Sequence, residues 1–287
     1  MQSTTALKGE KLRWPTWKAV ALYYAIACGW GWLAWSPVAL GSGGLKLIRW
    51  NPSIAVFSCI ATLGPFFGCF ITHRAESGNW RAVQVFPRSS PQWLWLLIGP
   101  LLVLATYFVI FPAFISKGSP THWRWHPAVL TGLFAWMFSY NLLGGPLFEE
   151  FGWRGFLQAC LQQVMPPWVA AICVGALWAA WHAPLFLVSW SSASPPVFIL
   201  IEIGLSQLMG LAFNASGGAV LVAILMHSAF NSSRFLDPFL GDTPTREIPS
   251  AEIFLAFAFL AMGALAVVIT RGRLRTGETQ STSIVPG

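Results

Sequence analysis

Charged side chains are scarce in this 287-residue sequence, at 9% of the chain, whereas a soluble globular domain carries about 25%. Hydrophobic residues make up 55%. This balance excludes a water-soluble globular protein and predicts an integral membrane protein. The net charge of +7 does not indicate nucleic-acid binding, because most basic residues lie in short polar segments and at the ends of the chain, where they fix orientation in a membrane.

Cysteine is also scarce, and the sequence contains no C-x-x-C pair. The cysteines lie scattered in apolar segments, at Cys28, Cys59, Cys69, Cys160 and Cys173. An odd number with this spacing argues against a disulfide framework and against a zinc knuckle. We expect them to act as small hydrophobic residues.

Long apolar runs separated by polar breaks favour membrane-spanning helices over the short alternating strands of an outer-membrane barrel. The sequence therefore predicts an all-α polytopic bundle that forms a single transmembrane domain over residues 1–287. We expect about eight transmembrane helices, or nine if 146–163 also spans, in a bacterial or archaeal plasma membrane. The predicted spans are 19–40, 53–72, 92–116, 128–143, 168–190, 195–214, 218–233 and 251–270.

The distribution of basic residues predicts the orientation of this bundle. With eight spans, one side holds Lys8, Lys11, Arg13, Lys18, Arg74, Arg81, Arg88, Arg271, Arg273 and Arg275. The other side holds Lys46, Arg49, Lys117, Arg124, Arg234 and Arg246. The more basic side faces the cytoplasm, and nine spans divide the residues more evenly. We therefore expect a cytoplasmic N-terminus, cytoplasmic tails at 1–18 and 271–287, and Glu149 near the cytoplasmic side.

Residues 127–233 contain four formal charges, Glu149, Glu150, Arg154 and Glu202. Ionisable groups inside a membrane are costly and mark a candidate functional site. The Gly144-Gly145-Pro146 sequence should break one helix and start another at Pro146. Three of the four charges would lie at the beginning of that second helix.

On this helix Glu150 and Arg154 are four residues apart, so they can form an ion pair. Glu149 lies about 100° away around the helix and need not share the arginine, which would leave it free for chemistry. The alternative is that all three form one buried network that only holds helices together. Glu202 can equally line a substrate cavity or bond to a neighbouring helix.

Two histidines lie on later helices. His182 follows Trp178 by one turn and precedes Pro184, whereas His227 and Asn231 share one face of their helix. Each pattern alone is typical of interhelical packing. Together with Glu149 they supply the groups for peptide hydrolysis: a carboxylate and an imidazole to activate water, and a second imidazole and an amide to stabilise an oxyanion.

The patterns Glu149-Glu150-x-x-x-Arg154, Trp178-x-x-x-His182 and His227-x-x-x-Asn231, in this order on successive helices, resemble the three motifs of the CPBP family. This family comprises intramembrane CAAX proteases and bacteriocin-processing enzymes. The resemblance covers a catalytic core of about residues 145–233, and Trp178 replaces the usual phenylalanine.

The resemblance implies that Glu149 is the general base and that His182 helps it to activate water. It also implies that His227 and Asn231 stabilise the oxyanion, while Glu150, Arg154 and Trp178 support the site. We expect no required cofactor; the alternative is Zn²⁺ held by Glu149, His182 and His227.

The implied activity is that of a membrane endopeptidase, with a glutamate-type mechanism preferred over a metalloprotease. Its partners would be the lipid bilayer and a prenylated protein or small precursor peptide at the membrane, and no nucleic acid. One rival is a non-catalytic immunity or scaffold protein of the same lineage. A transporter or channel is disfavoured, because inverted repeats are not evident.

Overall fold

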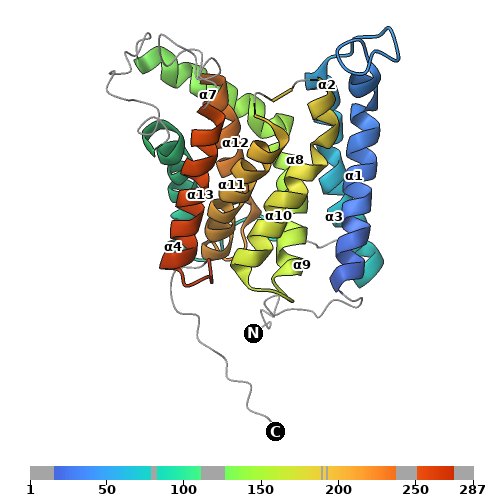
Figure 1. Cartoon of the computed structure of the whole chain (residues 1–287). Helices are drawn as coiled ribbons and strands as arrows, with labels where there is room; N and C mark the ends of the chain where they lie inside the picture. The colour runs from blue at the N-terminus through green and yellow to red at the C-terminus, as the bar shows by residue number, and fades with distance from the viewer. Residues whose placement is uncertain are drawn as a thin grey trace.

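The computed structural model of the chain describes residues 16–78, 83–110, 127–188, 190–191, 193–236 and 251–274, which form helices and no strands (Figure 1). The predicted all-α class is confirmed. Of the predicted tails, 1–15 and 275–287 lie outside the described residues. Eight of the basic residues that predict the orientation also lie outside the described residues: Lys8, Lys11, Arg13, Arg81, Lys117, Arg124, Arg246 and Arg275.

The helices follow the predicted apolar runs closely. The first half of the chain forms α1 (Thr16–Leu40), α2 (Ile54–Ala61), α3 (Leu63–Ser77), α4 (Ser90–Trp93), α5 (Trp95–Ala105) and the π-helix η1 (Thr106–Ile110). The middle forms α7 (Pro127–Gly144), α8 (Pro146–Gly152), the π-helix η2 (Trp153–Gln158), α9 (Ala159–Leu161) and α10 (Pro167–Trp181). The rest forms the 3-10 helix η3 (Ala183–Val188), α11 (Pro195–Ala215), α12 (Val220–Leu236) and α13 (Ala251–Ile269).

Four helical segments in the described part of the chain are long and apolar enough to cross a membrane: Ile54–Ser77, Ser90–Phe108, Pro195–Ala215 and Ala251–Ile269. The share of residues buried in α11 is 72%, against 22–33% in the other three. Leu33, Val268 and Ile269 are among the large apolar residues that remain exposed. A central α11 within helices that turn apolar side chains outward is a membrane bundle; the number of crossings stays a prediction.

Helix α11 can lie at the centre because two glycines allow close backbone approach. A Cβ atom on Gly175 of α10 would lie 2.7 Å from the Cα of Ile203 and 2.8 Å from the carbonyl oxygen of Glu202. A Cβ atom on Gly204 would lie 2.5 Å from the carbonyl carbon of Phe259 in α13. Contacts of this closeness leave no room for a side chain, and they set Glu202 beside α10.

The first turn of α1 and the last turn of α13 lie at the same end of the bundle, which we call the proximal end; the opposite end is the distal end (Figure 1). Gly272, just after α13, lies against Trp168 in the first turn of α10. Helix α10 therefore starts at the proximal end and runs toward the distal end. The loop between α1 and α2 lies at the distal end (Figure 1).

The break between α7 and α8 lies inside the bundle rather than at its surface. Helix α7 ends at Gly144, and a Cβ atom on Gly145 would contact Thr62, about a third of the way along the 54–77 segment from its distal end. Glu149 is one turn further on, in the distal half. Its predicted position near the cytoplasmic side depends on the orientation in the membrane and stays a prediction.

Candidate active site

Glu150, Arg154 and His227 form a buried charged cluster between α8, η2 and α12. Arg154 Nη1 donates to both carboxylate oxygens of Glu150 at 2.9 Å, so the ion pair predicted from the spacing is present. His227 Nδ1 lies 2.9 Å from Glu150 Oε1. Glu150 and Arg154 are 0% exposed. The Arg154 guanidinium lies 4.7 Å from the Trp178 ring centroid, a cation–π contact that covers this cation from the cavity side.

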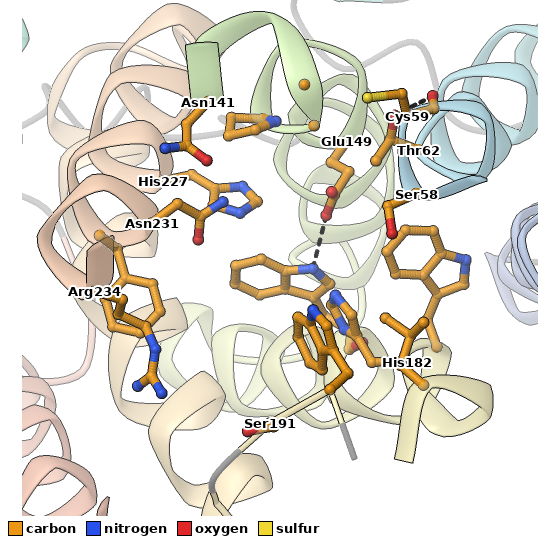
Figure 2. Close-up of a pocket in the computed structure, with 18 of the residues that line it drawn as sticks. Ser58, Cys59, Thr62, Asn141, Glu149, His182, Ser191, His227, Asn231 and Arg234 are labelled. Atoms are coloured by element: carbon orange, nitrogen blue, oxygen red, sulfur yellow. Dashed lines mark hydrogen bonds between the residues drawn. The ribbon is translucent and has the colours of Figure 1, made fainter. Parts of the chain in front are cut away.

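Glu149 points away from that cluster. Its Oε2 accepts hydrogen bonds from the indole N–H groups of Trp178 at 2.9 Å and Trp153 at 3.4 Å; Figure 2 draws the shorter one. No hydrogen bond joins Glu149 to Arg154 among the described residues. The Trp178 indole donates a bond that a phenylalanine at this position could not, so this departure from the usual motif gives the carboxylate a partner.

His182 is fixed just beyond the end of α10. Its Nδ1 lies 3.0 Å from the Trp178 carbonyl oxygen. Because a carbonyl can only accept, Nδ1 carries the hydrogen and Nε2 of the neutral ring is an acceptor. The imidazole stacks on Trp190, with ring centroids 5.2 Å apart and planes 7° apart, and it lies against Trp35 on another side.

His227 is also held through its Nδ1, but by a carboxylate in place of a backbone carbonyl. Glu150 is ionised by its pairing with Arg154, so the His227 Nδ1 donates to it. The remaining nitrogen, Nε2, can donate a second hydrogen bond only when the ring is an imidazolium. The ring also packs against Trp178 with centroids 4.7 Å apart. Asn231, one turn further along α12, is half-buried.

A cavity of about 480 Å³ brings these residues together. Figure 2 shows Glu149, His182, His227 and Asn231 around the same space, drawn from α8, the end of α10 and α12. Trp178 also lines this cavity, whereas Glu150 and Arg154 lie behind its wall. All seven predicted site residues are thus within one contiguous assembly, with four of the polar ones facing the cavity.

The cavity also contains residues that the sequence did not single out. Asn141 of α7 and Arg234 of α12 line it, together with Trp35, Cys59 and Trp190. Asn141 could have been found from the sequence, because it is a polar residue near the end of an apolar run. Glu202, whose role stayed open, also lines the cavity. It is 3% exposed, and its Oε2 has no hydrogen-bond partner in the described part of the protein.

The residues do not fit a preformed metal centre. Within the described ranges, no group of three or more His, Cys, Asp and Glu side chains is arranged to hold a metal ion. The Glu149 Oε2 accepts two indole hydrogen bonds. We therefore derive no chemical step through zinc.

Comparison with known proteins supports the resemblance drawn from the motifs. Residues 130–233 match the family model described as type II CAAX prenyl endopeptidase Rce1-like. The chain is 28% identical over 132 residues to the CAAX prenyl protease 2 of Methanococcus maripaludis, a match that covers 43% of this chain and 48% of that protein. The chain thus spans about half the length of the curated relative it matches.

The fold and the cavity define a polytopic helical membrane protein with an acid, two imidazoles and a carboxamide around one internal space. The segment that carries all three motifs is similar to the type II CAAX prenyl endopeptidases.

Proposed function

We propose that this protein is an intramembrane endopeptidase that hydrolyses a peptide bond in a membrane-associated peptide. The observation that carries the proposal is the convergence of Glu149, His182, His227 and Asn231 on one cavity. The match to the CAAX endopeptidase family supports the reaction class. The substrate would be a prenylated C-terminal peptide or a small precursor peptide, whose apolar portion the tryptophan-lined wall can receive.

In the proposed reaction, water lies between Glu149 and the His182 Nε2. Glu149 takes one proton as the oxygen attacks the scissile carbonyl carbon, and His182, an acceptor at Nε2, orients the water. The carbonyl oxygen becomes an oxyanion, which receives hydrogen bonds from the His227 imidazolium and the Asn231 amide. Protonated Glu149 then gives its proton to the leaving nitrogen as the C–N bond breaks, which releases a carboxylic acid and an amine.

The different Nδ1 partners of the two imidazoles support this division of roles. The Trp178 carbonyl makes His182 an acceptor toward the cavity, which suits water. Glu150 holds the His227 Nδ1, so that a protonated His227 would present its Nε2–H group to an oxyanion. The buried Glu150–Arg154 pair would thus act by holding the His227 ring in place rather than by touching substrate.

Hydrolysis of a peptide panel tests this proposal. Purified protein is incubated with farnesylated and unprenylated versions of the same peptide, with and without a chelator. We expect cleavage of at least one of the two forms, at a rate that the chelator does not change, because the proposed steps use protein groups alone. Activity that is lost in chelator and restored by zinc would overturn the metal-free mechanism. Failure to cleave any peptide would count against the endopeptidase proposal itself.

The orientation of the cavity separates the two substrate classes. Its lining includes the first turn of α2 and the last turns of α7 and α12, all in the distal half of the bundle. If the N-terminus is cytoplasmic, as the basic residues predict, this half faces away from the cytoplasm. The site would then meet a precursor peptide on the outer side of the membrane rather than a cytoplasmic prenylated protein.

Cys59 is a natural reporter of this orientation, because it is exposed and lines the cavity. Cys28, Cys69 and Cys160 are buried, and Cys173 is half-buried. We expect a membrane-impermeant maleimide to label intact cells at Cys59, and a Cys59→Ser variant to remain unlabelled. If Cys59 is labelled only in inside-out vesicles, the orientation is the opposite of the predicted one, and a prenylated protein becomes the favoured substrate.

A further inference from the structure

Glu202 of α11 is an acid in the cavity wall that the proposed mechanism does not use. It is 3% exposed, and its Oε2 has no hydrogen-bond partner in the described part of the protein. Arg154, behind the wall, is bound to Glu150. Arg234, which lines the same cavity, is bound to Glu252. A buried carboxyl group without a partner is costly to keep inside a membrane protein, which indicates a role in binding.

Helix α11 turns Glu202 toward the cavity. Phe198, Ile201 and Glu202 all line this space, and their spacing of three and four residues places them on one face of the helix. The centroid of the Phe198 ring lies 5.4 Å from that of the His182 imidazole. Glu202 is therefore one helical turn away from a ring that contacts the imidazole proposed to orient water.

The packing of α10 against α11 places Glu202 at the inner end of the cavity. A Cβ atom on Gly175 of α10 would lie 2.8 Å from the Glu202 carbonyl oxygen. Trp178 follows Gly175 by three residues and His182 follows it by seven, so at 1.5 Å per residue they lie about 5 and 10 Å further toward the distal end. Because the Trp178 indole donates to Glu149, the backbone of Glu202 lies about one turn on the proximal side of the proposed general base.

The surroundings of Glu202 suit a cation rather than an anion. Glu149 and Glu202 both face the cavity, whereas Arg234, the one arginine among its described lining residues, is already paired with an acid. The inner end therefore attracts positive charge and repels negative charge. The rings of Phe198 and Trp178 line the same space. Aromatic faces attract cations and also pack against the apolar stems of lysine and arginine.

The cation that fits this place is an organic one. Within the described ranges, no group of three or more His, Cys, Asp and Glu side chains is arranged to hold a metal ion. An ammonium or guanidinium group needs a single carboxylate and no fixed coordination geometry. The long, flexible stem of lysine can carry its ammonium group from a peptide backbone near Glu149 to the inner end of the cavity.

We propose that Glu202 binds the basic side chain of a lysine or arginine that lies close to the scissile bond of the substrate. This inference rests on the proposed function for the place of the peptide, whose scissile carbonyl lies beside Glu149 and His182. It makes Glu202 a specificity-determining residue for a substrate cation and gives a buried acid in an apolar helix a partner.

Binding to a catalytically disabled protein tests this cation site without relying on turnover. The probes are short N-acetylated fluorescent peptides, with and without a farnesyl-cysteine, in which each other residue in turn is lysine or its uncharged analogue norleucine. In the Glu149→Gln background, we expect lysine in at least one position to bind on the order of tenfold more tightly than norleucine, because it adds a charge-assisted hydrogen bond. Adding Glu202→Gln should bring the ratio of the two dissociation constants to about one.

Glu202→Asp and Glu76→Gln, each added to the Glu149→Gln protein, are the matched controls. The first keeps a negative charge in the cavity, and the second makes the same chemical change in a buried acid that does not line it. We expect both to retain the preference for lysine. If no peptide binds to the Glu149→Gln protein, or lysine and norleucine bind equally at every position, the inference is overturned even if Glu202→Gln does not fold. A preference that survives Glu202→Gln would also overturn it.

The cation site and the proposed hydrolysis can fail separately. If wild-type protein cleaves none of these peptides but the preference for lysine is present and depends on Glu202, the proposed hydrolysis fails and the cation site stands. If wild-type protein cleaves lysine and norleucine peptides alike and binding shows no preference, the hydrolysis stands and the cation site fails.

Discussion

Glu149→Gln should reduce peptide hydrolysis on the order of 10³-fold, within the range expected for loss of a general base. The amide is close in size to the carboxylate, and its oxygen can still accept the indole hydrogen bond that Trp178 donates to Glu149. It cannot take a proton from water near neutral pH. We therefore expect a folded protein with nearly unchanged affinity for the peptide and a large loss in kcat, measured at saturating farnesylated peptide.

Glu76→Gln is the matched control for this loss. Glu76 of α3 is also buried, at 2% exposed, and it does not line the cavity. The same chemical change there should leave kcat within about twofold of wild type, since surroundings away from the reacting atoms contribute little to the chemical step. A Glu149→Gln protein that remains as active as Glu76→Gln would remove Glu149 from the mechanism.

The second large effect is on stability. Arg154→Met should lower the free energy of unfolding by about 3–5 kcal/mol, because it leaves the buried Glu150 carboxylate without its cation. Arg154 donates to both oxygens of Glu150, so the substitution removes two charge-assisted bonds at once. A denaturant titration of the detergent-solubilised protein, or the midpoint of its thermal aggregation, measures the loss.

The double variant Glu150→Gln with Arg154→Met separates the ion pair from packing. Removing both charges avoids the isolated buried carboxylate, so this protein should recover part of the stability lost in Arg154→Met. It should remain inactive, because His227 loses the carboxylate that holds its Nδ1 and positions its ring. If the Arg154→Met protein is as stable as wild type, the cluster of Glu150, Arg154 and His227 does not hold α8 to α12.

Local features of the site could be predicted well from the sequence. The Gly144-Gly145-Pro146 break lies where the helix rules put it, since α8 begins at Pro146. The four-residue spacing of Glu150 and Arg154 predicted the ion pair. These features depend on helix periodicity and on proline and glycine chemistry, which act within a few residues of chain.

Features that depend on how helices pack could not be predicted in the same way. Gly145, just after α7, lies close to Thr62 of a segment far away in the sequence, and the sequence alone could not place this contact. The contacts of the Trp178 indole with Glu149 and of Trp190 with His182 join residues from separate segments. The rotation of each helix about its own axis decides which side chains make such contacts. An almost uniformly apolar sequence does not indicate which face of a helix is turned inward.

The most direct test of the account is a mass spectrum of the farnesylated peptide after incubation with wild-type protein in ¹⁸O-labelled water. Activated water should add one ¹⁸O atom to the new carboxyl group of the N-terminal product, and the Glu149→Gln protein should form almost none of this product. Intact peptide with wild-type protein, or equal labelled product from Glu149→Gln, would contradict the claim that Glu149, His182, His227 and Asn231 form a hydrolytic site.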